Sequence, residues 1–310
     1  MLALVMSGAA NFGAMQAGAL EVLLEQGLMP RMVVGSSAGA LNAIYLGARP
    51  SLEGVQELQD TWRRAGPDQV GVPKPFVALR RIVSGKDGLL ASEALAAFLR
   101  ENLPRGMDTF GELTAKTGIR AYAVAVGMRS GKMRVFGDDP QDRLLDGAMA
   151  STAVPPYFPP WPVGDERYLD GGVFAKLPLT AAIERGATRI VGLNVGFSMG
   201  SNATAKGILG ISGYALSLMV EAQRAYEECW ARRLGAALRV IELPAPIEVS
   251  FWDYGQADRL ISLGRELARQ ALAAEPLRLG PGWRARLRRA LKRGALHTAH
   301  QLTLPESAGV

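Results

Sequence analysis

The stretch from Val33 to Tyr45, VVGSSAGALNAIY, constrains the fold more than any other part of the sequence. A short apolar run ends in GSSAG, and a helical pattern of small and apolar residues follows directly. These five residues fit G-x-S-x-G, which marks a sharp strand-to-helix turn that displays its central serine. Gly35 and Gly39 would let neighbouring backbone pass close to Ser37, and the following helix would point its N-terminal amides toward that serine. The pattern predicts Ser37 as a nucleophile and Ser36 as a small spacer, and a serine-capped turn is the alternative.

Short apolar runs alternate with helical patterns along the rest of the chain. The alternation begins with a strand at residues 3–7 and closes with a helix at residues 256–274. This order predicts a parallel α/β sheet with right-handed crossovers. Residues 50–90 are less regular and contain prolines at positions 67, 73 and 75, so we expect them to form a lid or cap.

The basic character of the chain is concentrated at its C-terminal end. The whole sequence has 35 Lys and Arg against 29 Asp and Glu, but residues 276–305 hold seven basic residues and no acid. Within residues 283–294, Trp283, Leu287 and Leu291 share one face of a helical wheel and basic residues occupy the remainder. Such a helix is typical of peripheral contact with an anionic membrane, and packing on the body is the alternative. We therefore expect a catalytic domain over 1–275 and a basic amphipathic tail over 276–310, with no nucleic-acid partner.

A serine nucleophile needs a base, and histidine is the usual one. The histidines of this chain, His297 and His300, both lie in the tail, which is a poor place for a group that must sit rigidly beside Ser37. Without a usable histidine, a carboxylate is the candidate for the base that accepts the serine proton. Asp170, in YLDGGV, ends an apolar strand, and the two glycines that follow, Gly171 and Gly172, allow a tight turn and close approach of other groups.

Composition excludes several other classes of protein. Cys229 is the single cysteine, so the chain has no intramolecular disulfide framework and no cysteine cluster for zinc. The apolar runs are shorter than the roughly 18 residues that a membrane span needs. The apolar N-terminal stretch is short and lacks the basic segment that a signal peptide would have, so we expect no signal peptide there. We expect a cytoplasmic protein, with peripheral membrane contact, that needs neither metal nor organic cofactor.

With these motifs in place, the chain resembles the patatin-like phospholipase family over most of residues 1–275. The resemblance rests on a small-residue loop after the first strand, GSSAG after the second, and DGG, with further likeness in AMASTAVPPYFPPW and FWDYGQADRLISLGRELA. It implies a three-layer α/β/α fold with a central, mostly parallel sheet. It also implies a phospholipase A-type lipid acyl hydrolase that uses a Ser-Asp dyad, here Ser37 and Asp170, and forms an acyl-enzyme.

The loop that the resemblance assigns to the oxyanion hole departs from the family pattern. That pattern usually reads G-G-G-x-R-G, with Lys in place of Arg in some members, and its backbone amides act together with the amide of the residue after the nucleophile, here Ala38. Alanine adopts positive φ at a higher cost than glycine, so we expect slower or redirected catalysis. The loop residues of this chain are Gly8, Ala9, Ala10, Asn11, Phe12 and Gly13.

Two alternatives remain open at this point. The first is a catalytically weak patatin-like protein that binds lipid or a partner, motivated by Phe12 at the position of the basic residue. The second is an α/β-hydrolase in which Ser37, Asp170 and His297 follow the chain order Ser, Asp, His. Only one strand precedes the strand of the elbow, which is fewer than that fold usually has.

Overall fold

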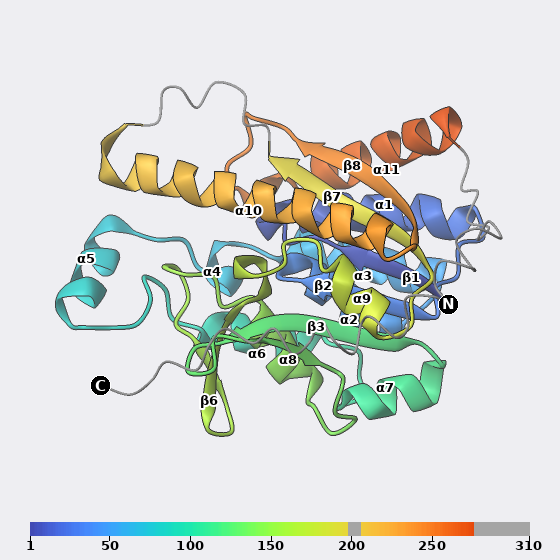
Figure 1. Ribbon diagram of the computed structural model, residues 1–310. Coiled ribbons are helices and arrows are strands. Elements are labelled where there is room, and N and C mark those ends of the chain that lie inside the picture. The colour runs from blue at the N-terminus through green and yellow to red at the C-terminus, as the bar shows by residue number, and fades with distance from the viewer. Residues whose placement is uncertain (198–205, 276–310) are drawn as a thin grey trace.

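The computed structural model describes residues 1–197 and 206–275, and in this part of the chain a central sheet lies between two layers of helices (Figure 1). The strand order is β5-β6-β3-β2-β1-β7-β8, and β4 pairs with β3. Strands β3, β2, β1, β7 and β8 run parallel to one another, whereas β4 and β6 are antiparallel to β3 and β5 is antiparallel to β6. The strands are β1 (Leu2–Met6), β2 (Met32–Ser36), β3 (Arg120–Gly127), β4 (Met133–Phe136), β5 (Trp161–Val163), β6 (Glu166–Asp170), β7 (Arg189–Phe197) and β8 (Ala237–Ala245).

The helices divide between the two faces of this sheet. Helices α1, α2, α7, α8 and α11 pack on one face, and α9 and α10 pack on the other, where Figure 1 shows α10 lying across the strands. The expected three-layer α/β/α fold with a mostly parallel sheet is therefore confirmed. The helices are α1 (Gly13–Glu25), α2 (Ala38–Ala48), α3 (Leu52–Arg64), α4 (Pro67–Val70), α5 (Pro75–Val83), α6 (Glu93–Asn102), α7 (Phe110–Thr117), α8 (Leu144–Ser151), α9 (Leu179–Glu184), α10 (Gly207–Arg233) and α11 (Ala257–Ala274), and the short 3₁₀ turns are η1 (Ala10–Phe12), η2 (Gly171–Val173) and η4 (Tyr254–Gln256).

Side-chain alternation along the strands builds two separate cores. On β1, Leu4 and Met6 join the core under α1 and α2, whereas Ala3 and Val5 join the core under α9. Successive side chains of a strand point to opposite faces, so a strand that is apolar at every position is buried on both sides. The continuous apolar runs of the sequence follow from this arrangement.

Helices α1 and α11 pack with their backbones almost in contact. A Cβ added at Gly18 would overlap the carbonyl of Ile261, and one added at Gly264 would overlap the carbonyl of Met15. Glycine at both crossings allows this approach. The packing of α1 on α11 matters for the site because α1 directly follows the loop at residues 8–12, which lies beside Ser37.

Residues 50–90 are more helical than their prolines suggest, and they divide into two parts. Helix α3 packs on α1 and belongs to the body. Helix α5 has no buried residue and stands apart at the left of Figure 1. The expected lid or cap role of this segment stays a prediction. The basic tail at 276–310, with the membrane contact expected at 283–294 and both histidines, lies outside the described residues.

Within the described chain, no helix combines the length and the apolar character that crossing a membrane requires.

Candidate active site

Ser37 stands at the turn between β2 and α2 in a strained backbone conformation. Its φ is 54° and its ψ is −128°, a region that residues other than glycine rarely adopt. A Cβ at Gly35 would overlap the carbonyl of Gly39, and a Cβ at Gly39 would overlap the carbonyl of Met6. Both glycines of the motif are therefore sterically required, which is the geometry of a nucleophile elbow.

Asp170 reaches the elbow because its strand pairs with the same neighbour as the strand of the serine. In the sheet, Ser36 of β2 lies opposite Val124 of β3, and Asp170 of β6 lies opposite Ala125 of β3. A Cβ on Gly171 would overlap the carbonyl of Val124 and would lie 2.7 Å from the Ser36 Oγ. The first glycine after Asp170 is thus needed for the close passage of the two turns.

The carboxyl group of Asp170 is almost completely buried. Asp170 is 3% exposed and Ser37 is 8% exposed. The Gly172 amide donates to Asp170 Oδ1 at 2.6 Å, whereas Oδ2 has no hydrogen-bond partner among the described residues. Burial raises the pKa of Asp170 to about 7, and interactions with the Ser37 side chain and the Gly172 amide partly oppose this rise.

The approach of the Ser37 hydroxyl to Asp170 is looser than a formed hydrogen bond. The hydroxyl is close enough to lower the pKa of the carboxyl, yet Oδ2 accepts no hydrogen bond of ordinary geometry. Catalytic hydrogen bonds are often long in the absence of substrate and tighten when it binds. The Asp170 carboxyl thus lies near the Ser37 side chain, and a catalytic dyad between the two stays a prediction.

Ser151, at the end of α8, fastens the elbow from below. The Ser37 amide donates to Ser151 Oγ at 2.9 Å, and Ser151 Oγ donates to the Val124 carbonyl at 2.6 Å. Both groups are buried. The sequence analysis did not identify Ser151 as a site residue. Its position in AMASTAVPPYF, a segment that resembles the family ahead of Asp170, could have indicated it. By contrast, the spacer Ser36 is buried with its Oγ unpartnered among the described residues.

The loop at residues 8–13 wraps over the elbow. A Cβ on Gly8 would lie 3.4 Å from the Ser37 Cβ, and a Cβ on Gly13 would lie 3.0 Å from the Ala38 Cβ. Ala10, at the exposed tip of the loop, adopts a φ of 48°. The expected strain of alanine at a glycine position is therefore present at this residue.

The amides of the loop are not equally available. Gly8 donates to the Lys176 carbonyl at 2.9 Å, Phe12 donates to the Ala9 carbonyl at 3.0 Å, and Gly13 donates within the turn. The amides of Ala9, Ala10, Asn11 and Ala38 donate to no backbone carbonyl of the described residues. Three of the seven residues predicted for the oxyanion hole thus have engaged amides, and an oxyanion role for the others stays a prediction.

Side chains of the loop point into the body instead of toward Ser37. Phe12 is buried and meets the ring of Phe251 edge to face at 5.7 Å. The Asn11 Nδ2 donates to the carbonyls of Ser250 and Asp253 at 2.9 and 3.0 Å. Phe12 and Asn11 therefore anchor the loop to the segment before α11, and an apolar anchor stands where the family pattern has a basic residue.

A buried chain of amides ties the base of this loop to three helices. Gln16 Nε2 donates to the Ser7 carbonyl at 2.9 Å, and Asn42 Nδ2 donates to Gln16 Oε1 at 2.9 Å. Trp62 Nε1 of α3 donates to Asn42 Oδ1 at 2.8 Å. Because buried polar groups are costly to leave unpaired, this chain fixes the position of α1 and α2 relative to the end of β1.

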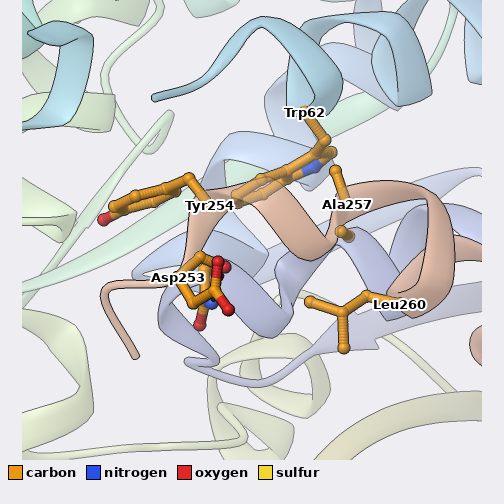
Figure 2. A pocket seen from close by; sticks show the side chains of 7 residues that line it. Trp62, Asp253, Tyr254, Ala257 and Leu260 are labelled. Atoms are coloured by element: carbon orange, nitrogen blue, oxygen red, sulfur yellow. Dashed lines mark hydrogen bonds between the residues drawn. The ribbon is translucent and has the colours of Figure 1, made fainter. Parts of the chain in front are cut away.

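A small hollow lies behind the loop. Figure 2 shows the rings of Trp62 and Tyr254 along one side of it, and Asp253 and Leu260 along the other. Neither Ser37 nor Asp170 lines this hollow, which borders the loop only through Asn11. The strained Ser37 and the buried Asp170 lie at the elbow instead, and their catalytic role stays a prediction.

Other reactive side chains stay apart from this site. Cys229 is an exposed thiol on α10. Over residues 1–197 and 206–275, no three His, Cys, Asp or Glu side chains gather as a metal-binding group. The elbow, the loop and Asp170 thus make up the candidate site.

The family model named patatin-like phospholipase matches residues 4–183, which is more than half of the chain and includes both Ser37 and Asp170. The chain belongs to the patatin-like phospholipase family. The resemblance read from the motifs is therefore confirmed. No curated protein matches this patatin-like chain.

Several solved structures are similar to this patatin-like chain. VipD from Legionella pneumophila is 15% identical with a TM-score of 0.47, covering 88% of this chain and 66% of VipD. ExoU in complex with SpcU from Pseudomonas aeruginosa is 17% identical with a TM-score of 0.42, covering 97% and 61%. Human GIVD cytosolic phospholipase A2 is 11% identical with a TM-score of 0.43, covering 88% and 59%. This chain thus spans less than two thirds of the length of each.

Proposed function

We propose that this chain is a serine lipid acyl hydrolase of phospholipase A type, which cleaves the carboxylic esters of acyl lipids with a Ser-Asp dyad. Family membership supports the lipid substrate. The observation that carries the mechanism is the meeting of a strained Ser37 with a buried Asp170 whose pKa is near neutrality. Catalytic groups need a pKa near the working pH, and Asp170 meets this requirement as a general base.

The first half of the reaction makes an acyl-enzyme. Asp170 accepts the proton of the Ser37 hydroxyl while Ser37 Oγ attacks the ester carbonyl, and a tetrahedral intermediate forms. The protonated Asp170 then gives its proton to the departing alkoxide, and the acyl group stays on Ser37. Because Asp170 must be ionised to begin this cycle, we expect ester turnover to rise as the pH increases through about 7.

The second half releases the fatty acid. Asp170 takes a proton from a water molecule that attacks the acyl-enzyme, and then returns it to Ser37 Oγ as the acid leaves. We assign stabilisation of both tetrahedral intermediates to the amides of Ala9, Ala10, Asn11 and Ala38, which donate to no backbone carbonyl of the described chain. Each such donor typically contributes about 3 kcal/mol to transition-state stabilisation. The N-terminus of α2 adds a favourable electrostatic potential at the same place.

A fluorophosphonate probe tests the proposal without the natural substrate. We expect the probe to label the full-length chain at Ser37, as located by mass spectrometry of the labelled peptide. Ser37→Ala is expected to lose the label and to reduce hydrolysis of a chromogenic short-chain ester to background. Ser36→Ala is the matched control, because it removes the adjacent buried hydroxyl, and it should keep the label. Labelling at another residue, or equal labelling of Ser37→Ala, would contradict the dyad.

A binding protein with little catalytic power is the second candidate. It is favoured by the apolar anchor Phe12 and by the engaged amides of Gly8 and Gly13 in the loop. The same chromogenic ester separates the two functions. Equal turnover by the wild-type chain and by Ser37→Ala, with both proteins folded, would favour binding over hydrolysis.

A further inference from the structure

Helix α5 presents large apolar side chains to solvent. Phe76 is 80% exposed and Val83 is 79% exposed, and Leu79 and Ile82 are more than half exposed. On a helical wheel these four positions fall within one arc of about 120°, so they form a single stripe. Contiguous exposed apolar surface of this kind marks a site of interaction with a protein or a membrane.

Cations surround this stripe. Residues 74–86 contain four basic side chains and no acidic one. The side chains of Lys74, Arg80 and Lys86 are exposed and make no ion pair with a described residue, whereas Arg81 Nε donates to the Gly88 carbonyl at 2.6 Å. The positive charge of the segment is therefore largely uncompensated by the chain itself.

Three of these cations converge on a hollow at the end of the helix. Arg80, Arg81, Ser84 and Lys86 line a space of about 220 Å³. Guanidinium and ammonium groups beside a hydroxyl suit the oxygens of a phosphate group. An apolar stripe next to a cationic hollow matches the two levels of a lipid surface, where acyl chains lie beneath phosphate headgroups.

The segment that leaves α5 is attached to the loop after α8, and that loop in turn is hydrogen-bonded to the candidate base. The amides of Leu89 and Leu90 donate to the carbonyls of Pro156 and Tyr157 at 3.0 and 2.7 Å. A few residues earlier in that loop, the Ala153 carbonyl accepts the amide of Asp170 at 3.0 Å. In Figure 1, α5 lies on the side of the molecule toward which the carboxyl end of β1 points. A surface bound by α5 would therefore lie on the side of the elbow.

We propose that α5, with Lys74 and Lys86 at its two ends, docks the protein on an anionic lipid surface. The stripe of Phe76, Leu79, Ile82 and Val83 enters the boundary between headgroups and acyl chains, and the cations bind the lipid phosphates. The charge pattern favours a lipid surface over a protein groove, because all the cations flank one apolar stripe without an intervening acid. The inference rests on the proposed function only in that a lipid hydrolase meets its substrate at such a surface.

The test compares two matched pairs of substitutions in the full-length chain. All proteins carry Ser37→Ala, so vesicles are not hydrolysed during the measurement. The probe is a vesicle of phosphatidylcholine with about one third phosphatidylglycerol, and binding is measured by co-sedimentation. Phe76→Ser with Arg80→Glu is expected to weaken binding by at least about tenfold. Met29→Ser with Arg31→Glu likewise replaces an exposed apolar side chain with serine and an exposed arginine with glutamate, at residues before β2, and should bind as the parent does.

The comparison separates docking by α5 from other causes of binding. The tail at 276–310 is present in every protein, so its contribution cancels between the two pairs. Equal vesicle affinity of the two pairs would overturn the proposal. So would a parent protein, carrying Ser37→Ala alone, that does not bind these vesicles, or that binds vesicles of phosphatidylcholine alone equally well. Ile82→Ser with Lys86→Glu repeats the test at other members of the segment and should show a similar loss.

Failure of the proposed function gives a different result. Hydrolysis of a soluble short-chain ester by the chain with Ser37 intact reports on the dyad and does not depend on vesicles. A chain that binds anionic vesicles through α5 but hydrolyses no ester would keep the docking proposal and reject the hydrolase. A chain that hydrolyses the ester but loses no vesicle affinity on substitution of α5 would do the reverse.

Discussion

Asp170 combines two properties that oppose each other, a position fit for proton transfer and a buried charge. Its pKa of about 7 lies well above the ordinary value of 3.8, because burial disfavours the ionised form. Between these two values the folded protein holds more protons than the unfolded chain does. The free energy of unfolding therefore falls as the pH rises from about 4 to about 7. The ionised form of Asp170, which the proposed reaction requires, therefore lowers the stability of the folded protein at and above about pH 7.

Replacing the carboxyl with an amide should remove this cost. Asp170→Asn keeps an oxygen for the Gly172 amide and carries no charge, so at about pH 8 we expect it to be more stable than wild type by at most about 4 kcal/mol. The advantage should shrink toward zero as the pH approaches about 4. Urea unfolding across this pH range measures it. Asp165→Asn, at an exposed turn, is the control. A pH-independent difference between Asp170→Asn and wild type would contradict the assigned burial.

Ser151 is a positioning residue for the elbow. Ser151→Ala leaves the Ser37 amide without its acceptor, so we expect kcat for a soluble ester to fall roughly tenfold to hundredfold with little change in KM. Loss of the bond also costs about 1–3 kcal/mol of stability. Ser36→Ala removes a hydroxyl that has no partner among the described residues, and should change both quantities much less. Equal effects of the two substitutions on kcat would show that the Ser151 bond does not position the elbow.

At the scale of elements, the contact between α1 and α11 places the first helix of the site. The loop at residues 8–13 has one end on β1 and the other on α1, so a shift of α1 displaces the candidate oxyanion amides. The crossing depends on Gly18 and Gly264, where added side chains would meet backbone carbonyls of the partner helix. Backbone cannot rotate aside as a flexible side chain can, so this contact tolerates little change.

Gly264→Val should therefore separate the two helices. The new side chain would overlap the carbonyl of Met15, and we expect a loss of at least about 2 kcal/mol in the free energy of unfolding. Chemical denaturation gives this value. Ala273→Val introduces the same side chain at an exposed position of α11 and should cost much less. Similar stability of the two variants would mean that the helices can move apart at little cost.

At the scale of the whole molecule, the question is which parts of the chain supply groups to the site. The triad alternative takes its base from His297, in the tail, whereas the dyad takes it from β6. Substitution of both His297 and His300 with Ala in the full-length chain distinguishes them. We expect the double variant to keep kcat within about threefold of wild type, because the dyad uses no histidine. Removal of a triad member typically lowers kcat by a thousandfold or more. A loss of that size in a folded protein would favour the triad.

The strands, helices and elbow were largely predictable because they depend on short stretches of sequence. The first strand, expected at residues 3–7, is β1 (Leu2–Met6), and the closing helix, expected at residues 256–274, is α11 (Ala257–Ala274). The short strand β5 and the helices α3, α4, α5 and α7 were not predicted. Prolines made residues 50–90 look irregular, although Pro67 and Pro75 stand at helix starts, where a missing N–H costs nothing.

Within the site, the sequence by itself determined the elbow. Gly35, Ser37 and Gly39 are within five residues of one another, and sterics at that range leave few backbone paths. It also indicated Asp170 by exclusion, since the two histidines are in the tail. The resemblance to a family, and not local physics, pointed to the loop at residues 8–13.

The tertiary structure alone decided which groups meet. Asp170 lies 133 positions beyond Ser37 in the sequence and comes close to it because β6 pairs antiparallel with β3. Many other strand orders would be compatible with the same local sequence patterns. Tertiary packing likewise brings Ser151 of α8 to the elbow amide and the Lys176 carbonyl to the Gly8 amide. Local periodicity reports burial and backbone shape, whereas contacts across the chain depend on strand order and register, which a single sequence does not reveal.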